Sequence, residues 1–246
     1  MLKKRIIISL TFLDGVLFRT KKFIPDYRYT KNFVGLWSID EIILTDISKK
    51  KFSNEFINII SFFSSNCFVP ISVGGGISTI EHADEYFKIG ADKIILGSKS
   101  IQNVKIISEI AMKYGSQSII QSIDIKKDDN SKYKLAINSG LIMTETDPKD
   151  AIEIGLKNGA GEILINNVDF DGSLLGYDLE VIKNLTKNYN CQFLALGGAG
   201  NWEHMAKLLK ETDVSAACSQ NIFHFTDESI SAAKNYLKKK DILVRT

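Results

Sequence analysis

Short apolar runs alternate along this chain with longer segments in which apolar residues recur at helical spacing. The apolar runs predict strands at residues 5–10, 41–46, 71–73, 93–97, 118–124, 162–166, 193–196 and 215–219. The amphipathic segments predict helices near residues 30–37, 52–64, 79–88, 102–113, 148–158, 178–188, 201–210 and 227–239. Because strands that alternate with helices run in one direction, this pattern predicts a parallel sheet.

Eight βα units in a chain of 246 residues predict an α/β fold of the closed (β/α)8 type, the TIM barrel, which typically takes about 250 residues. The structural alternative is a doubly wound open sheet. It is disfavoured because no glycine-rich dinucleotide motif follows the first predicted strand. No linker or low-complexity tract interrupts the pattern, so we expect a single domain over residues 1–246.

The two halves of the chain repeat each other at a constant offset. Asp46 ends one predicted strand and Asp169 follows the corresponding strand of the other half, 123 residues later. Gly75 and Gly198, in two glycine clusters, are also 123 residues apart. Each cluster leads into a predicted helix that carries Glu-His, at residues 81–82 and 203–204. Several positions that repeat at one period indicate an internal duplication of a half-barrel.

Composition narrows the class of protein further. Hydrophobic residues make up 44% and charged residues 24%, which excludes a disordered or fibrous chain. The 31 basic and 29 acidic residues give a net charge of +2, so we expect neither a nucleic-acid partner nor an anionic membrane. Three cysteines without metal-ligand spacing predict neither a disulfide scaffold nor a metal site, and a reducing cytoplasm is the expected compartment.

The basic N-terminus followed by apolar residues 6–13 has the beginning of a signal-peptide pattern. The apolar run ends at Asp14-Gly15 without a small-residue cleavage site, which favours a buried first strand. No run approaches the roughly 18 apolar residues that a membrane span needs.

In a barrel, the loops after the strands form the active-site face. One glycine-rich loop follows a strand in each half, at residues 74–76 and 197–198. Glycines allow a backbone to approach an anion closely, so the pair favours a ligand with two anionic ends. The alternative is that these glycines serve only tight turns.

Acidic residues at this face are candidates for proton transfer. Asp124 ends the fifth strand and can serve as a general base, although a carboxylate there can also cap the following turn. Its counterpart in the first half is Thr11, so a mechanism with two carboxylates lacks a member. Asp46 and Asp169 are further candidates, while Asp171 before Gly172 reads best as part of a turn.

Charged residues also begin four of the strands, two of them basic and two acidic: Arg5, Glu41, Lys93 and Glu162. A ring of these side chains would plug the bottom of the barrel, and spacing alone favours a stabilising role. The histidines at 82, 204 and 224 and the cysteines at 67 and 191 are interpreted as surface or packing residues. The basic residues at 19, 21, 22 and 28 indicate a solvated loop, or one that closes over an anionic substrate.

Several of these motifs together resemble the cyclase subunit of imidazole glycerol phosphate synthase, the HisF family. The similarity extends over nearly the whole chain, at residues 4–7, 14–15, 39–41, 44–47, 73–77, 90–93, 159–164, 169–172, 176–178, 197–200 and 223–225. The resemblance implies a (β/α)8 barrel that pairs with a HisH-like glutaminase. The glutaminase would dock at the bottom face and send ammonia through the barrel.

The resemblance also assigns roles to single residues. Arg5, Glu41, Lys93 and Glu162 match the gate at the ammonia entrance. Asp124 matches the general base. Two phosphate sites of a phosphorylated substrate fall on Gly76, Gly97 and Ser98 and on Gly172, Gly198 and Asn221. No cofactor is implied. Because Gly97 lacks the side-chain amide usual there, we expect the second of these sites to bind an anion before the first.

The same resemblance shows departures from the family pattern at the active-site face, which is the mouth of the barrel. The general acid falls on Thr11, the lysine of the first loop on Arg19, and the usual Asn, Gly, Thr and Ser positions on Gly97, Glu145, Asn166 and Leu196. A retained entrance with an altered mouth resembles the diverged, glycosyl amidation-associated branch of HisF-like proteins. Those proteins work with a HisH-like glutaminase and a sugar amidotransferase.

Three hypotheses follow for the function. The first is an ammonia-delivering synthase subunit for acetamidino modification of an N-acetyl sugar in surface polysaccharide. The second is a histidine-pathway cyclase that tolerates Thr11, and the third is a non-catalytic scaffold that activates the glutaminase and channels ammonia. The altered mouth favours the first over the second. No sequence feature separates the first from the third.

Overall fold

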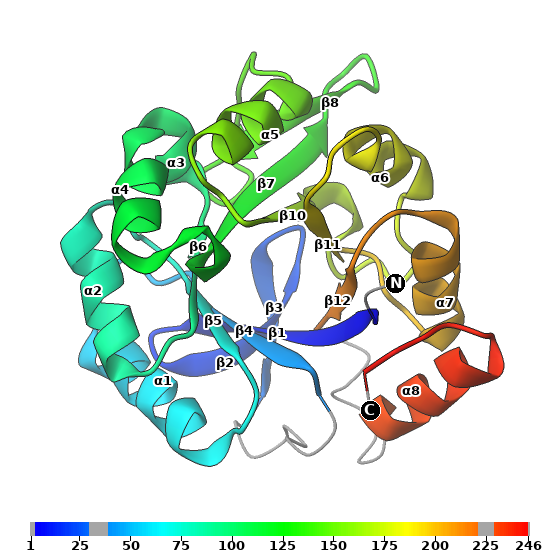
Figure 1. Cartoon of the computed structure of the whole chain (residues 1–246), viewed down its shortest axis with the longest axis horizontal. Helices are drawn as coiled ribbons and strands as arrows, with labels where there is room; N and C mark the ends of the chain where they lie inside the picture. Colours follow the sequence, from blue (N-terminus) through cyan, green and yellow to red (C-terminus); the bar gives the residue numbers. More distant parts are fainter. Residues whose placement is uncertain (1–2, 30–38, 221–228, 246) are drawn as a thin grey trace.

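The computed structural model describes residues 3–29, 39–220 and 229–245. Parallel strands form a closed barrel, in which β10 pairs with β7 and β12 pairs with β1 (Figure 1). The barrel strands are β1 (Arg5–Leu13), β4 (Glu41–Asp46), β5 (Ile71–Gly74), β6 (Lys93–Leu96), β7 (Ile119–Lys127), β10 (Glu162–Asn167), β11 (Gln192–Leu196) and β12 (Ala216–Ser219). All eight lie where the apolar runs predict them, and the prediction of a (β/α)8 barrel is confirmed.

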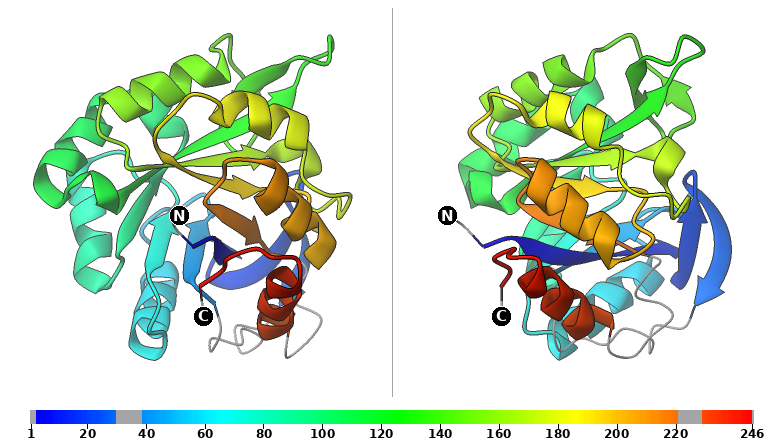
Figure 2. Two further views of the ribbon diagram at one scale, coloured as in Figure 1. Left: turned by 45° about the vertical axis from the view of Figure 1, so that its right-hand side comes forward. Right: turned by 90° about the vertical axis from the view of Figure 1, so that its right-hand side faces the viewer.

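Helices surround this barrel on its outside (Figure 2). They are α1 (Asn54–Asn66), α2 (Ile80–Ile89), α3 (Ser98–Gln102), α4 (Lys105–Tyr114), α5 (Pro148–Lys157), α6 (Leu179–Thr186), α7 (Trp202–Glu211) and α8 (Ser229–Lys239). Polar side chains cap several of them: the Asn201 side chain accepts a hydrogen bond from the backbone N–H of His204 at the start of α7. The helix expected at 102–113 is α4, which begins at Lys105, and the separate short helix α3 precedes it. The helix expected near 30–37 lies outside the described residues.

Two hairpins extend the barrel strands beyond their predicted ends. Strand β1 continues through the Asp14-Gly15 turn into β2 (Val16–Lys21) and β3 (Ile24–Tyr29), where the sequence indicated a loop. Both turn residues have positive φ, 48° and 75°, which is the geometry that joins two antiparallel strands tightly. A second hairpin, β8 (Tyr133–Ile137) and β9 (Ile142–Met143), continues β7. Figure 2 shows the β2–β3 hairpin at the end of the barrel opposite both termini.

Successive side chains of a strand point to opposite faces, so the barrel strands contribute to two separate apolar regions. In β1, Ile6 and Ile8 belong to the large core between the barrel and its helices, whereas Ile7 belongs to a smaller cluster. The smaller cluster fills the barrel interior with one residue or more from seven strands: Ile7, Ile43, Ile95, Ile120, Leu164, Leu194, Ala216 and Cys218. Inward-facing polar residues therefore lie above and below this apolar layer.

The described part of the chain contains no helix that is both long and apolar enough to cross a membrane. Within the same residues, no group of three or more His, Cys, Asp or Glu side chains is arranged to hold a metal ion. Cys67 and Cys191 are half-buried against the core, as expected for packing residues.

Candidate active site

A cavity of about 320 Å³ lies at the C-terminal ends of the barrel strands. Its walls come from the ends of β1, β4, β5, β6, β7, β10 and β11 and from the loops that follow them. This is the end at which barrel enzymes place their reacting groups. We refer to this cavity as the mouth.

Among the carboxylates of the mouth, Asp124 has the pKa that departs most from its usual value. Its Oδ1 accepts hydrogen bonds from the Ser122 hydroxyl at 2.9 Å and from the Asn166 amide at 3.2 Å. Burial raises the pKa of Asp124 to about 6, and these two hydrogen bonds act in the opposite direction. A carboxylate with a pKa near neutrality can both accept and return a proton at physiological pH.

Thr11 lies in the wall of the same cavity, on the first strand. It is only 8% exposed, and its neighbour across the hairpin is Phe18. A threonine hydroxyl does not ionise near neutral pH, so Thr11 can offer a hydrogen bond but cannot replace a carboxyl group as a general acid. Asp124 therefore has no carboxylate opposite it on β1.

The other two carboxylates in the walls have structural partners. Asp46 Oδ1 accepts hydrogen bonds from the backbone N–H and the hydroxyl of Ser48, at 2.9 and 2.5 Å. Asp171 Oδ2 accepts from the backbone N–H of Phe23 at 2.9 Å, and burial raises the pKa of Asp171. Asp171 thus ties the β2–β3 hairpin to the loop after β10, rather than serving only its own turn.

The two expected phosphate sites differ in their relation to the mouth. Gly76, Gly97 and Ser98 all line the cavity. Gly172 and Gly198 are absent from its walls: a Cβ on Gly172 would lie 2.6 Å from the Thr20 carbonyl, and one on Gly198 would overlap the Gly176 carbonyl. These two glycines allow close backbone packing. Asn221, the third member of the second site, lies outside the described residues, as does the histidine at 224.

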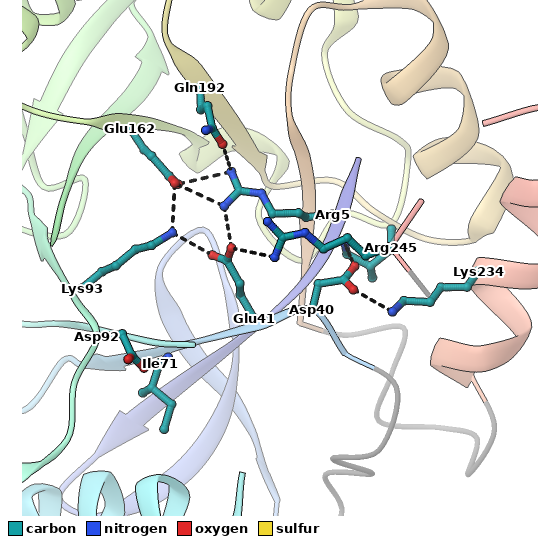
Figure 3. A network of polar contacts seen from close by, with 11 residues as sticks. Arg5, Asp40, Glu41, Ile71, Asp92, Lys93, Glu162, Gln192, Lys234 and Arg245 are labelled. Atoms are coloured by element: carbon teal, nitrogen blue, oxygen red, sulfur yellow. Dashed lines mark hydrogen bonds and ion pairs between the residues drawn. The ribbon is translucent and has the colours of Figure 1, made fainter. Parts of the chain in front are cut away.

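At the opposite end of the barrel, the four charged residues that begin strands meet in one ion-paired ring (Figure 3). Arg5 contacts Glu41 at 2.6 Å and Glu162 at 3.2 Å. Lys93 contacts the same two carboxylates at 3.2 and 2.9 Å. The carboxylates raise the pKa of Arg5 against the opposing effect of burial. The ring closes the bottom of the barrel below the apolar layer.

Sequence reasoning missed two further members of this network. Gln192, at the start of β11, accepts a hydrogen bond from Arg5 at 2.9 Å. Arg245, near the C-terminus, approaches Glu41 at 3.7 Å and is half exposed (Figure 3). The position of Gln192 at a strand start was a usable signal, because it matches that of the other ring residues. Nothing in the local sequence identifies Arg245.

Other missed residues surround the mouth. Ser122 lies two residues before Asp124 on one strand and so faces the same side, which the sequence could have indicated. The approach of Asn166 depends on the register of β10 against β7, in which it is paired with Asp124. Lys51 also lines the mouth, although it lies in a loop without a motif.

Several candidates lie away from the reacting groups. Arg19 pairs with Asp26 and lies 6.0 Å from the Tyr27 ring within the hairpin, and it does not line the mouth. Asp169 accepts a hydrogen bond from the backbone N–H of Lys127 at 2.8 Å. The histidines at 82 and 204 are half-buried near the helix starts, where each contacts its preceding turn.

Fold and site together define a (β/α)8-barrel protein with a candidate reaction centre at the strand ends and a closed charged ring at the other end. The family described as "Histidine biosynthesis protein" matches residues 13–228. "Imidazole glycerol phosphate synthase subunit HisF" of Dictyoglomus thermophilum is 36% identical over 251 residues, covering all of this chain and 99% of that protein. The subunits of the same name from Clostridium botulinum strain 657 and Bacillus cereus strain G9842 are 36% and 31% identical, with both chains fully covered.

This chain therefore belongs to the histidine biosynthesis protein family, and its full-length relatives are HisF subunits.

Proposed function

We propose that this chain is the synthase subunit of a glutamine amidotransferase complex of the imidazole glycerol phosphate synthase type. A HisH-like glutaminase would dock at the bottom face and release ammonia there. The mouth would then use the ammonia on a phosphorylated small-molecule substrate. The observation that carries this proposal is the charged ring, which lies directly below an apolar barrel interior that leads to Asp124.

The barrel interior suits neutral ammonia. Eight apolar or thiol side chains form the layer above the ring, and among them Ile120 and Leu194 are fully buried. An ammonium ion loses its hydration in such surroundings at high cost, whereas neutral ammonia passes more easily. In the closed ring, Arg5 and Lys93 each bridge both glutamates, so passage requires these ion pairs to rearrange.

At the mouth, Asp124 would serve as the general base. Its pKa of about 6 keeps most of it ionised at pH 7, ready to take a proton from the nitrogen that attacks the substrate. Ser122 and Asn166 both donate to Oδ1, and none of the described residues donates to Oδ2. One carboxylate oxygen thus remains for the substrate.

The acceptor of the ammonia separates two candidate functions. The names of the relatives support an imidazole-forming cyclase of histidine biosynthesis, because their identity of 36% extends over the full chain. Thr11 supports a changed acceptor, for which we propose an N-acetyl sugar that becomes an acetamidino sugar with the help of a sugar amidotransferase. Loss of one proton-transfer group typically slows such a step by about 10²–10⁴-fold.

The experiment that tests the complex uses the whole chain and a purified HisH-like glutaminase. We expect the two to copurify and glutamine hydrolysis to accelerate in the complex. Hydrolysis at an unchanged rate, or no complex at all, would contradict the proposed subunit role.

A second experiment decides the acceptor. We expect the chain not to restore growth without histidine in a strain that lacks the histidine cyclase, and we expect Thr11→Asp to increase growth because it supplies a second carboxylate. Thr11→Asn, of similar size but without an acid, is the matched control. Strong growth with the unaltered chain would establish the histidine cyclase and overturn the sugar acceptor.

A further inference from the structure

Lys51 places a positive charge in the wall of the mouth, at a position that no sequence motif predicts. Its side chain lies in the cavity wall beside Gly75 and Gly76. The ammonium donates a hydrogen bond to the Asp46 carbonyl at 2.8 Å. The stem crosses the face of Gly76, where an added Cβ would come within 2.7 Å of Lys51 Cδ. Gly76 therefore has a second role, which is to make room for this lysine.

The backbone on either side explains why Lys51 differs from its neighbours. Lys49 and Lys50 are exposed, whereas Lys51 is half-buried. Phe52 adopts a positive φ of 56°, an uncommon conformation for a bulky residue. Its ring lies 4.0 Å from the His82 ring and 4.9 Å from the Tyr86 ring, and these contacts with α2 hold the turn that directs Lys51 inward.

Burial leaves the Lys51 ammonium short of polar partners. Desolvation lowers the pKa of Lys51, and the nearby Asp46 only partly opposes this effect. An ammonium carries three N–H donors, and among the described residues only the Asp46 carbonyl is bound to it. A negatively charged ligand in the cavity would supply the missing acceptors.

Charge in the mouth is divided between its two sides. The described cations in its walls, Lys51 and Lys99, follow β4 and β6, beside the turns at 74–76 and 97–98. Two of the three carboxylates in the described walls, Asp124 and Asp171, lie in the second half of the chain. The third, Asp46, lies in the first half, where Lys51 is its neighbour and Ser48 donates two hydrogen bonds to its Oδ1. The first half therefore carries two cations and one carboxylate in these walls, and the second half carries two carboxylates, so an anion is favoured on the side of the first half.

Ser98 adds a neutral donor at the same place. Its hydroxyl oxygen accepts a hydrogen bond from the backbone N–H of Asn138 at 2.8 Å. The hydroxyl proton then remains available to a ligand in the cavity. A tetrahedral anion can use donors from several directions, which favours a phosphoryl group over a planar carboxylate.

We propose that Lys51 is a specificity-determining residue that binds a phosphoryl group of the substrate, together with the Gly75-Gly76 turn and the Ser98 hydroxyl. This inference rests on the proposed function in taking the mouth as the substrate site. It reverses the order expected from the sequence, which placed the stronger anion site at Gly198 and Asn221. The reason is that Lys51 compensates for the missing side chain at Gly97.

The test is a titration of the isotope-labelled full chain with inorganic phosphate, followed at single backbone amides by NMR. We expect the amides of Gly76 and Ser98 to respond at lower phosphate concentrations than the amide of Gly198. Lys51→Met, which keeps the stem and removes the charge, should raise the half-saturating concentration at the first pair about 10- to 100-fold. Lys50→Met, the exposed neighbour, should change it less than about twofold.

Each outcome decides the proposal. An unchanged response in Lys51→Met, or an equal loss in Lys50→Met, would overturn the role of Lys51, and so would a response that begins at Gly198. The spectrum itself reports whether each variant is folded, and Lys51→Gln repeats the test if Lys51→Met is not. Because the titration needs neither glutaminase nor substrate, its failure is distinguishable from failure of the proposed ammonia-using function.

Discussion

At the scale of single residues, the burial of Asp124 costs the fold stability. Its pKa is about 6 in the folded chain and near 3.9 in an unfolded one, so the folded state prefers the protonated carboxyl. By linkage, this group lowers the stability of the fold as the pH rises from about 4 to 6, and the full penalty applies above pH 6. A buried carboxylate kept at this cost is typical of a functional site.

The first residue-scale prediction is that Asp124→Asn stabilises the protein at neutral pH. The amide avoids the ionised form, and we expect a gain of about 1–2 kcal/mol in the free energy of unfolding at pH 7. This figure is below the full linkage value because Asp124 borders an open cavity. Below pH 4 the variant and the parent should have equal stability, and denaturant unfolding at both pH values measures the difference. A loss of stability at pH 7 would contradict the raised pKa.

Asn166 tunes the same carboxylate in the opposite direction. Its amide donates to Asp124 Oδ1 at 3.2 Å and lowers the pKa that burial raises. Asn166→Ala should therefore move the titration midpoint of Asp124 to a higher pH, as followed by carbon NMR of the aspartate carboxyls. Asn158→Ala, at the end of α5, is a control without a contact to Asp124. A midpoint that stays in place would exclude this hydrogen bond as a determinant.

At the scale of elements, the packing of α5 against β7 supports the position of Asp124. Gly155 of α5 faces the Gln121 side chain of β7, and a Cβ at this glycine would overlap the Gln121 side-chain oxygen. Gln121 also donates to the Ala151 carbonyl of the same helix at 3.3 Å. The close approach therefore fixes how the helix lies on the strand that carries Asp124.

The element-scale prediction concerns this contact. Gly155→Ala improves intrinsic helix propensity by about 1 kcal/mol, yet we expect a net loss of roughly 1–3 kcal/mol because the new methyl overpacks the interface. Pairing it with Gln121→Ala should recover much of the loss, since the shorter side chain removes the overlap. Thermal and denaturant unfolding of the single and double variants measure both effects. Ile154→Ala, at an exposed position of the same helix, should have a small effect.

At the scale of the whole molecule, the barrel separates two charged ends by an apolar layer. The bottom ring is nearly buried: the Arg5 side chain is 3% exposed and that of Glu41 is also 3% exposed. Buried charges require paired partners, so removal or reversal of one member is expected to disturb the others. We therefore expect the stability of the barrel to depend on whether this ring stays paired.

The whole-molecule prediction is that Lys93→Glu uncouples glutamine hydrolysis at the bottom of the barrel from the use of ammonia at the mouth. Three carboxylates would then face Arg5, and among the described residues the other cation paired with this ring is the half-exposed Arg245. We expect the glutamine-dependent reaction to fall at least tenfold, while the reaction with added ammonium salt, which can enter at the mouth, is reduced much less. Lys183→Glu, which breaks an exposed pair with Glu211 on the surface, is the control. Normal coupling in Lys93→Glu would mean that the ring does not govern ammonia entry.

The local pattern of apolar and polar residues was sufficient to predict much of this architecture. Eight apolar runs separated by amphipathic segments specified the barrel, because a parallel strand buried on both faces requires a continuous apolar sequence. The charged residues at the starts of four strands predicted a ring for a different reason. Residues at the same depth on the strands of a barrel come together when the sheet closes. Asp124 was predicted at the mouth because it ends the predicted strand 118–124, although β7 itself continues to Lys127.

The hairpins and the details of the mouth depended on contacts between distant segments. Asn166 reaches Asp124 only through the register of β10 on β7, and Asp171 reaches Phe23 only because the hairpin folds across the barrel. Lys51 turns inward because Phe52 packs on α2, and this contact cannot be predicted from the local sequence. The hydrophobic periodicity of the chain thus specifies the elements and their order. Which polar groups face one another depends on the folded barrel, because their burial and pairing energies exist only after the strands are aligned and the barrel is closed.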